Sequence, residues 1–106
     1  MGGSKSGDKA TTTSTASRTA SDNAVSIKSY MFGPNDLKVK VGTKVTWTNE
    51  DAVVHTVTAD TKLDSAPDSP DMAKNATYSF TFTKAGTYAY HCAPHPYMKG
   101  TITVTE

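Results

Sequence analysis

A thiol, an imidazole and a thioether lie within seven consecutive residues near the end of the chain, at Cys92, His95 and Met98. Two residues separate Cys92 from His95 and two more separate His95 from Met98, so one short loop can turn all three side chains towards a single ion. A fourth donor has to come from upstream. His55 is the natural candidate, because it sits in an apolar run typical of a strand, where burying an unpaired imidazole would be costly. These four residues predict a metal site.

The kind of donor indicates the kind of metal. Two His and one Cys with a weak axial Met form the donor set of copper sites that transfer electrons. Structural zinc sites use His and Cys but rarely Met. Four protein donors also leave no coordination position for a substrate, whereas catalytic metal sites keep one open. The pattern therefore predicts one copper ion that alternates between Cu(I) and Cu(II), one-electron transfer between proteins, and no enzymatic activity.

Three other interpretations remain open. A structural zinc site could use the same His and Cys residues. A copper carrier or storage protein would favour exposed, exchangeable Cu(I) ligands over ligands anchored in two separated strands. A plain adhesion-type β-sandwich would make Cys92 a small buried apolar residue, with His55 and His95 as ordinary polar residues. An intense visible band on addition of Cu(II) would separate electron transfer from this last interpretation.

Length and composition limit the chain to one small domain. It has 106 residues, a single Cys and a formal net charge of +1. The near-zero charge argues against a nucleic-acid partner, and no apolar run is long enough to span a bilayer. Residues 1–23 are rich in Ser, Thr and Ala and predict a disordered tail or linker, whereas residues 24–106 predict the folded domain. We expect a monomer.

Apolar and polar residues alternate with a period of two along most of residues 24–106, which is typical of strands with one wet face. Strands are predicted near residues 25–27, 37–41, 45–48, 55–59, 78–83, 88–92 and 102–104. Residues 60–75 carry turn-forming residues and predict a long crossover loop. Six or seven short strands without a convincing helix predict an all-β fold, a small Greek-key β-sandwich.

The same alternation predicts which way the residues beside the thiol point. If Tyr88 and Tyr90 face the core, Cys92 faces it too, and His91 points outwards. His91 is therefore predicted to be a surface imidazole and not a ligand.

The run of residues 86–100, Gly-Thr-Tyr-Ala-Tyr-His-Cys-Ala-Pro-His-Pro-Tyr-Met-Lys-Gly, resembles the C-terminal copper loop of the amicyanins. These are small cupredoxins, or type 1 blue copper proteins, within the plastocyanin-like family. The short spacing between the second His and the Met carries the resemblance, which extends back through residues 45–47 and His55 and covers residues 24–106. It implies a cupredoxin fold, electron transport and four copper ligands, namely His55, Cys92, His95 and Met98.

Two positions depart from the family pattern. Family members commonly carry Asn after the first His ligand and Thr or Ser after the Cys, whereas this chain has Thr56 and Ala93. The side-chain tie between the two ligand loops is therefore not expected in its usual form. The backbone N–H of Thr56 remains able to reach the Cys92 sulfur.

The surroundings of His95 suggest a docking surface. Pro94, Pro96 and Tyr97 predict an apolar patch at which the imidazole edge surfaces, and Val53 or Met72 are expected to add to it. Such a patch suits brief docking of redox proteins, both the electron donor and the electron acceptor. The resemblance further implies a location outside the cytoplasm, either in a periplasm or tethered to the cell surface.

Overall fold

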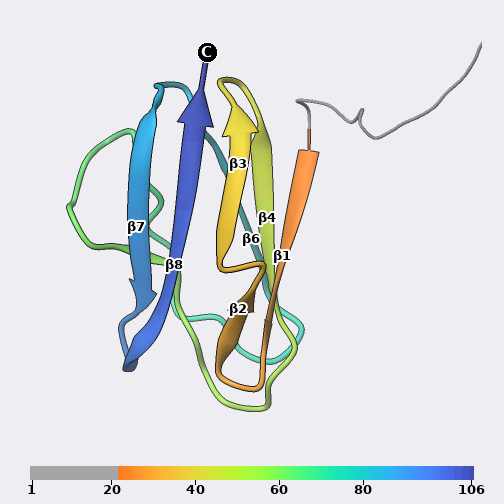
Figure 1. Cartoon of the computed structure of the whole chain (residues 1–106). Coiled ribbons are helices and arrows are strands. Elements are labelled where there is room, and N and C mark those ends of the chain that lie inside the picture. Colours follow the sequence, from red (N-terminus) through yellow and green to blue (C-terminus); the bar gives the residue numbers. More distant parts are fainter. Residues whose placement is uncertain (1–21) are drawn as a thin grey trace, which may run out of the picture.

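The computed structural model describes residues 22–106, which form two four-stranded β-sheets packed face to face (Figure 1). The first sheet has the strand order β2-β1-β4-β6, and the second has the order β3-β8-β7-β5. The strands are β1 (Asp22–Lys28), β2 (Met31–Gly33), β3 (Asp36–Lys40), β4 (Lys44–Asn49), β5 (Thr58–Ala59), β6 (Thr77–Thr81), β7 (Gly86–Cys92) and β8 (His95–Thr105). The predicted all-β sandwich is confirmed.

The strand connections cross between the sheets, as a Greek-key sandwich requires. The pairs β1–β4 and β3–β8 are parallel, and the other neighbours within the sheets are antiparallel. Strand β2 was not predicted, because its three residues are too few to display a period of two. Strand β1 begins two residues before the expected start of the domain, and the predicted tail otherwise lies outside the described residues.

Inward-facing residues of both sheets form one core around Trp47. Trp47 and Tyr90 are fully buried, and the indole Nε1–H of Trp47 donates a hydrogen bond to the Tyr90 hydroxyl at 3.2 Å. Tyr90 pairs with Gly100 across the β7–β8 ladder, and its ring occupies the space that a side chain at position 100 would need. The core thus extends along β7 to the thiol at the end of that strand.

Two predicted boundaries near the site were wrong. His55 does not lie in a strand, because β5 covers only Thr58–Ala59 and the residues from His55 to Val57 are buried consecutively, without alternation. An isolated bridge to Met72 holds the His55 backbone instead. His95, which was predicted to lie in a loop, instead begins β8. The chain reverses within two residues, and His95 then pairs with Cys92 of β7.

The β1–β2 and β7–β8 hairpins lie at the same end of the sandwich, opposite the C-terminus (Figure 1). Their turns therefore approach each other although they are distant in the sequence. In the part of the chain that the structure describes, no helix is long and apolar enough to cross a membrane.

Candidate metal centre

The β7–β8 turn brings Cys92 and His95 together. These two residues are partners in the antiparallel ladder, and only Ala93 and Pro94 lie between them. The ladder shifts register between His91 and Cys92, which is the mark of a bulge that re-aims a side chain. Cys92 is fully buried and His95 is half-buried. The turn therefore places a thiol inside the protein and an imidazole beside it at the surface.

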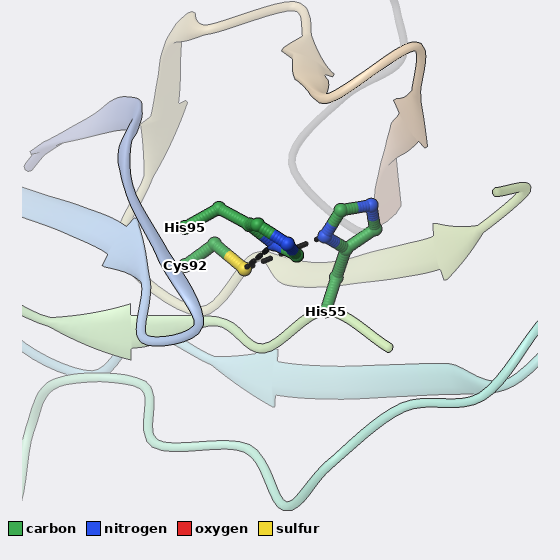
Figure 2. Close-up of side chains that lie close together, drawn as sticks. All are labelled: His55, Cys92 and His95. Atoms are coloured by element: carbon green, nitrogen blue, oxygen red, sulfur yellow. Dashed lines mark hydrogen bonds between the residues drawn. The ribbon is translucent and has the colours of Figure 1, made fainter. Parts of the chain in front are cut away.

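His55 completes a compact group of three donors (Figure 2). Its Nδ1 atom lies 3.4 Å from the Cys92 sulfur, and Nδ1 of His95 lies 3.5 Å from the same sulfur. The three ligand atoms all lie within 4.8 Å of one another. Both imidazoles thus present the same ring nitrogen to one thiol.

This group has the dimensions of a metal site. Metal–nitrogen distances of about 2.0–2.1 Å and metal–sulfur distances of about 2.3 Å put two donors of one trigonal ion roughly 3.5–4 Å apart. The two nitrogen-to-sulfur distances are close to that range. The donors are soft, and the thiol is a free cysteine in a buried position. The residues present therefore fit a copper ion.

Met98 lies on the same strand as His95 and faces the core. It is 3 % exposed and shares the inward face of β8 with Ile102 and Val104. Met98 is therefore the first buried residue of the strand that begins at His95. Met98, the fourth predicted donor, is thus buried and follows Cys92 and His95 closely in the sequence.

His55 lies outside the strands, and backbone hydrogen bonds to Met72 hold it in position. His55 N–H donates to the Met72 carbonyl at 3.2 Å, and Met72 N–H donates to the His55 carbonyl at 2.9 Å. The buried side chain of Asn49 donates from Nδ2 to the carbonyls of both Val53 and Met72, so it ties together the two segments that hold the imidazole. This role of Asn49 was not predicted from the sequence. The available signal was its inward parity with Val45 and Trp47.

Asp51 is a second residue whose role was not predicted from the sequence. Its Oδ2 atom lies 2.9 Å from Nε2 of His55, and it also accepts the backbone N–H groups of Ser29 and Tyr30. The Tyr30 N–H is the main cause that lowers the pKa of Asp51; burial acts in the opposite direction, and the His55 side chain and Ser29 N–H lower it further. Asp51 is therefore a carboxylate at neutral pH. No local pattern pairs an Asp with a turn twenty-two residues before it.

Thr56 joins the two ligand segments twice. Its N–H donates to the Cys92 sulfur at 3.5 Å, as the sequence analysis anticipated. Its Oγ1 accepts the backbone N–H of Ala93 at 2.8 Å, so a side-chain tie exists although the usual Asn and Thr pair is absent. The threonine hydroxyl is an acceptor and reaches a backbone donor, which removes the need for a side chain at position 93.

His91 lies apart from this group, as predicted. Its Nδ1 atom is 2.6 Å from Asp60 Oδ1, on the outward face of β7. The metal group found among the described residues contains His55, Cys92 and His95 and does not include it.

Residues 19–105 match the sequence model of the copper-binding proteins of the plastocyanin/azurin family. The chain belongs to this family. The match covers nearly all of the described residues, and the family's description as copper-binding agrees with the donor group above. The family assigned from the resemblance is thereby confirmed.

Three known proteins are similar to this chain in sequence or in structure. Amicyanin of Paracoccus denitrificans is 45% identical over 82 residues, which cover 76% of this chain and 63% of that protein, so the match spans less than two thirds of its length. A solved Cu(I) structure of an amicyanin variant has a TM-score of 0.72 at 40% identity and covers 84% of this chain and 88% of that one. The copper-containing nitrite reductase of Thermus scotoductus has a TM-score of 0.75 at 34% identity, over 80% of this chain but only 22% of that one.

Proposed function

We propose that this protein carries single electrons between redox proteins on one copper ion bound by His55, Cys92, His95 and Met98. The observation that carries the proposal is the buried thiol held at 3.4 and 3.5 Å from two imidazole nitrogens. Copper bound there supplies a one-electron couple between Cu(I) and Cu(II). The rest of the chain holds the donors, excludes water and presents one edge of the site to a partner.

The rigidity of the donor set supports the function of an electron carrier. His55 is fixed through its backbone by Met72, and Cys92 and His95 are fixed as the last pair of the β7–β8 ladder, on either side of a two-residue turn. Donors that move little when the charge on the ion changes keep the cost of reorganisation low, which favours fast transfer. The same closed set of four donors leaves no position for a substrate, so we propose a carrier and not an enzyme.

Burial of the donors weighs against the alternative function, in which the protein would transport or store copper ions. His55 and Cys92 are fully buried and Met98 is 3 % exposed, so only His95 reaches the surface. Rapid exchange of Cu(I) with another protein requires access to several ligands. The arrangement favours electron exchange over ion exchange.

We further propose that redox partners dock around His95. Exposed apolar side chains surround that end of the molecule, with Tyr97 at 68%, Val54 at 41% and Tyr30 at 39% exposure. Met72, which was expected to contribute to this patch, is buried beneath it because its backbone pairs with His55. The similarity to amicyanin and plastocyanin supports an extracytoplasmic location for this function.

Visible spectroscopy and voltammetry test the proposed function. Copper-loaded protein is expected to show an intense thiolate-to-copper band and one reversible one-electron wave. Cys92→Ser removes the thiolate, so the band is expected to disappear while the β-sheet circular dichroism remains. His91→Gln is the matched control, because it changes a neighbouring imidazole outside the donor group. A band that persists in Cys92→Ser would exclude this copper site.

A further inference from the structure

The turn between β1 and β2 has a backbone conformation that its residues ordinarily avoid. Ser29 and Tyr30 have φ angles of 54° and 58°, in the left-handed region. A two-residue hairpin turn of type I′ requires this region at both positions and usually meets the need with Asn and Gly. Other residues there carry strain, which persists only where neighbouring groups hold them. The turn therefore needs a partner that fixes it.

That partner is the Asp51 carboxylate. Its Oδ1 accepts the N–H of Ser29 at 2.8 Å, and its Oδ2 accepts the N–H of Tyr30 at 3.0 Å. The same Oδ2 lies 2.9 Å from Nε2 of His55. The side chain of Asp51 is 15% exposed and that of His55 is fully buried, so water competes weakly for these contacts. One carboxylate thus connects a strained turn to an imidazole of the metal group.

The contact with Asp51 determines the tautomer of His55. An ionised carboxylate only accepts hydrogen bonds, so Nε2 of a neutral imidazole must carry the proton. Nδ1 then presents its lone pair to the space beside the Cys92 sulfur, 3.4 Å away. An imidazole binds a metal through such a lone pair, and a carboxylate on the opposite nitrogen raises its donor strength.

The turn also places an aromatic ring against both imidazoles. The Tyr30 ring meets the His55 ring edge-on with centroids 5.4 Å apart, and it meets the His95 ring edge-on at 5.0 Å. The two imidazoles come from separate segments and lie 5.1 Å from each other. Tyr30 therefore restricts the rings of both histidines from the solvent side, since edge-to-face contacts favour one ring orientation.

We propose that Asp51 is a positioning residue of the metal centre. It acts directly on His55, by holding the proton on Nε2, and it acts on His95 through Tyr30, whose ring the Asp51-bound turn places against both imidazoles. The proposal deepens the proposed function, and only its copper measurements rest on that function. Its measurements on the metal-free protein stand alone.

The tautomer test uses ¹⁵N NMR of the metal-free protein at pH 8, with Asp51→Asn, Asp51→Ala and the exposed control Asp64→Asn. We expect the wild type and the control to hold the proton on Nε2 of His55. In Asp51→Ala the share of the Nδ1–H form should rise, and amide exchange at Ser29 and Tyr30 should accelerate at least about tenfold, because both donors lose their acceptor. Asp51→Asn keeps the shape and one acceptor, so it serves if the alanine variant does not fold. An unchanged tautomer and unchanged exchange in both variants would overturn the proposal.

The copper test measures affinity and reduction potential in the same variants. Loss of an outer carboxylate is expected to weaken copper binding about 10- to 100-fold in Asp51→Ala and to raise the potential, because a weaker imidazole donor and a lost negative charge disfavour Cu(II). Tyr30→Leu should broaden the His95 ring signals, and Tyr30→Phe should restore them, since it keeps the ring. Equal behaviour of these two variants would overturn the role of Tyr30. A wild type without the thiolate band would reject the proposed function, and the tautomer measurement would still decide the role of Asp51.

Discussion

Thr56 shows how a single residue can replace a pair. Its N–H reaches the Cys92 sulfur and its Oγ1 accepts the N–H of Ala93, so one threonine supplies both links between the ligand segments. A hydrogen bond to the ligand sulfur withdraws electron density from the thiolate, and the second bond keeps the turn after Cys92 in place. The two bonds thus have separate roles and can be tested separately.

Thr56→Val removes the Oγ1 acceptor and keeps the backbone N–H. We expect the thiolate-to-copper band to remain, the amide of Ala93 to exchange about tenfold faster, and the free energy of unfolding to fall by about 1 kcal/mol. Hydrogen exchange and urea unfolding measure these effects. Thr58→Val is the control, because it removes the hydroxyl that lies 2.8 Å from Thr56 Oγ1 without touching the bond to Ala93. Equal exchange at Ala93 in both variants would show that the side-chain tie is unimportant.

Strands β7 and β8 form the element that carries three of the four proposed donors. Their ladder begins at the Cys92–His95 pair and continues past Tyr90 and Gly100 to the far end of the sheet. The ring of Tyr90 lies against Gly100, and its hydroxyl accepts the Trp47 hydrogen bond, so both contacts hold the ring in position. The close approach at Gly100 therefore couples the core to the register of the metal-binding hairpin.

Gly100→Ala is expected to destabilise the hairpin by overpacking. A Cβ there would lie 2.8 Å from Tyr90 Cε1 and closer still to its Cζ and Oη. Such a clash costs about 1–3 kcal/mol, which corresponds to a fall in Tm of roughly 4–8 °C for each kcal/mol in a domain of this size. Calorimetry of the metal-free protein measures it. Gly33→Ala is the matched control, since its nearest neighbour would be the Ser26 carbonyl oxygen at 3.9 Å. A Tm equal to that of the control would contradict this packing account.

At the scale of the whole molecule, the Trp47–Tyr90 contact joins the two sheets through the centre of the core. Trp47 belongs to β4 of the first sheet and Tyr90 belongs to β7 of the second. Burial of Tyr90 raises its pKa to about 12, and the hydrogen bond from Trp47 offsets part of that rise. The folded protein therefore binds the phenol proton more tightly than the unfolded chain does.

This difference makes stability depend on alkaline pH. The pKa of Tyr90 in the folded state exceeds its usual value of about 10. The protonated phenol therefore stabilises the fold by roughly 2–3 kcal/mol below pH 10, and this contribution is lost as the pH rises towards 12. Tyr90→Phe should lose stability at neutral pH, since it leaves the buried Trp47 N–H unpaired, but its stability should fall less between pH 10 and 12. Urea unfolding across that range measures this. Tyr97→Phe, at a 68% exposed position, should keep the wild-type slope. Parallel slopes for all three proteins would contradict the assignment to Tyr90.

The sequence alone determined the class of fold and singled out the proposed donors. A period of two along a strand is a local property, so the inward direction of Cys92 and the outward direction of His91 followed from their neighbours. Donor chemistry is also local, because Cys, His and Met keep their preference for soft metals in any fold. These features required no knowledge of which segments meet.

Only the tertiary structure decided what surrounds the donors. The contacts that fix them join residues far apart in the chain, with a sequence separation of 37 for Thr56 and Ala93 and of 22 for Ser29 and Asp51. His55 is held by a bridge to Met72 instead of by a strand of its own. Each of these contacts forms because the sandwich brings its loops to one end, and a hydrogen bond across such a distance leaves no periodic trace in the sequence.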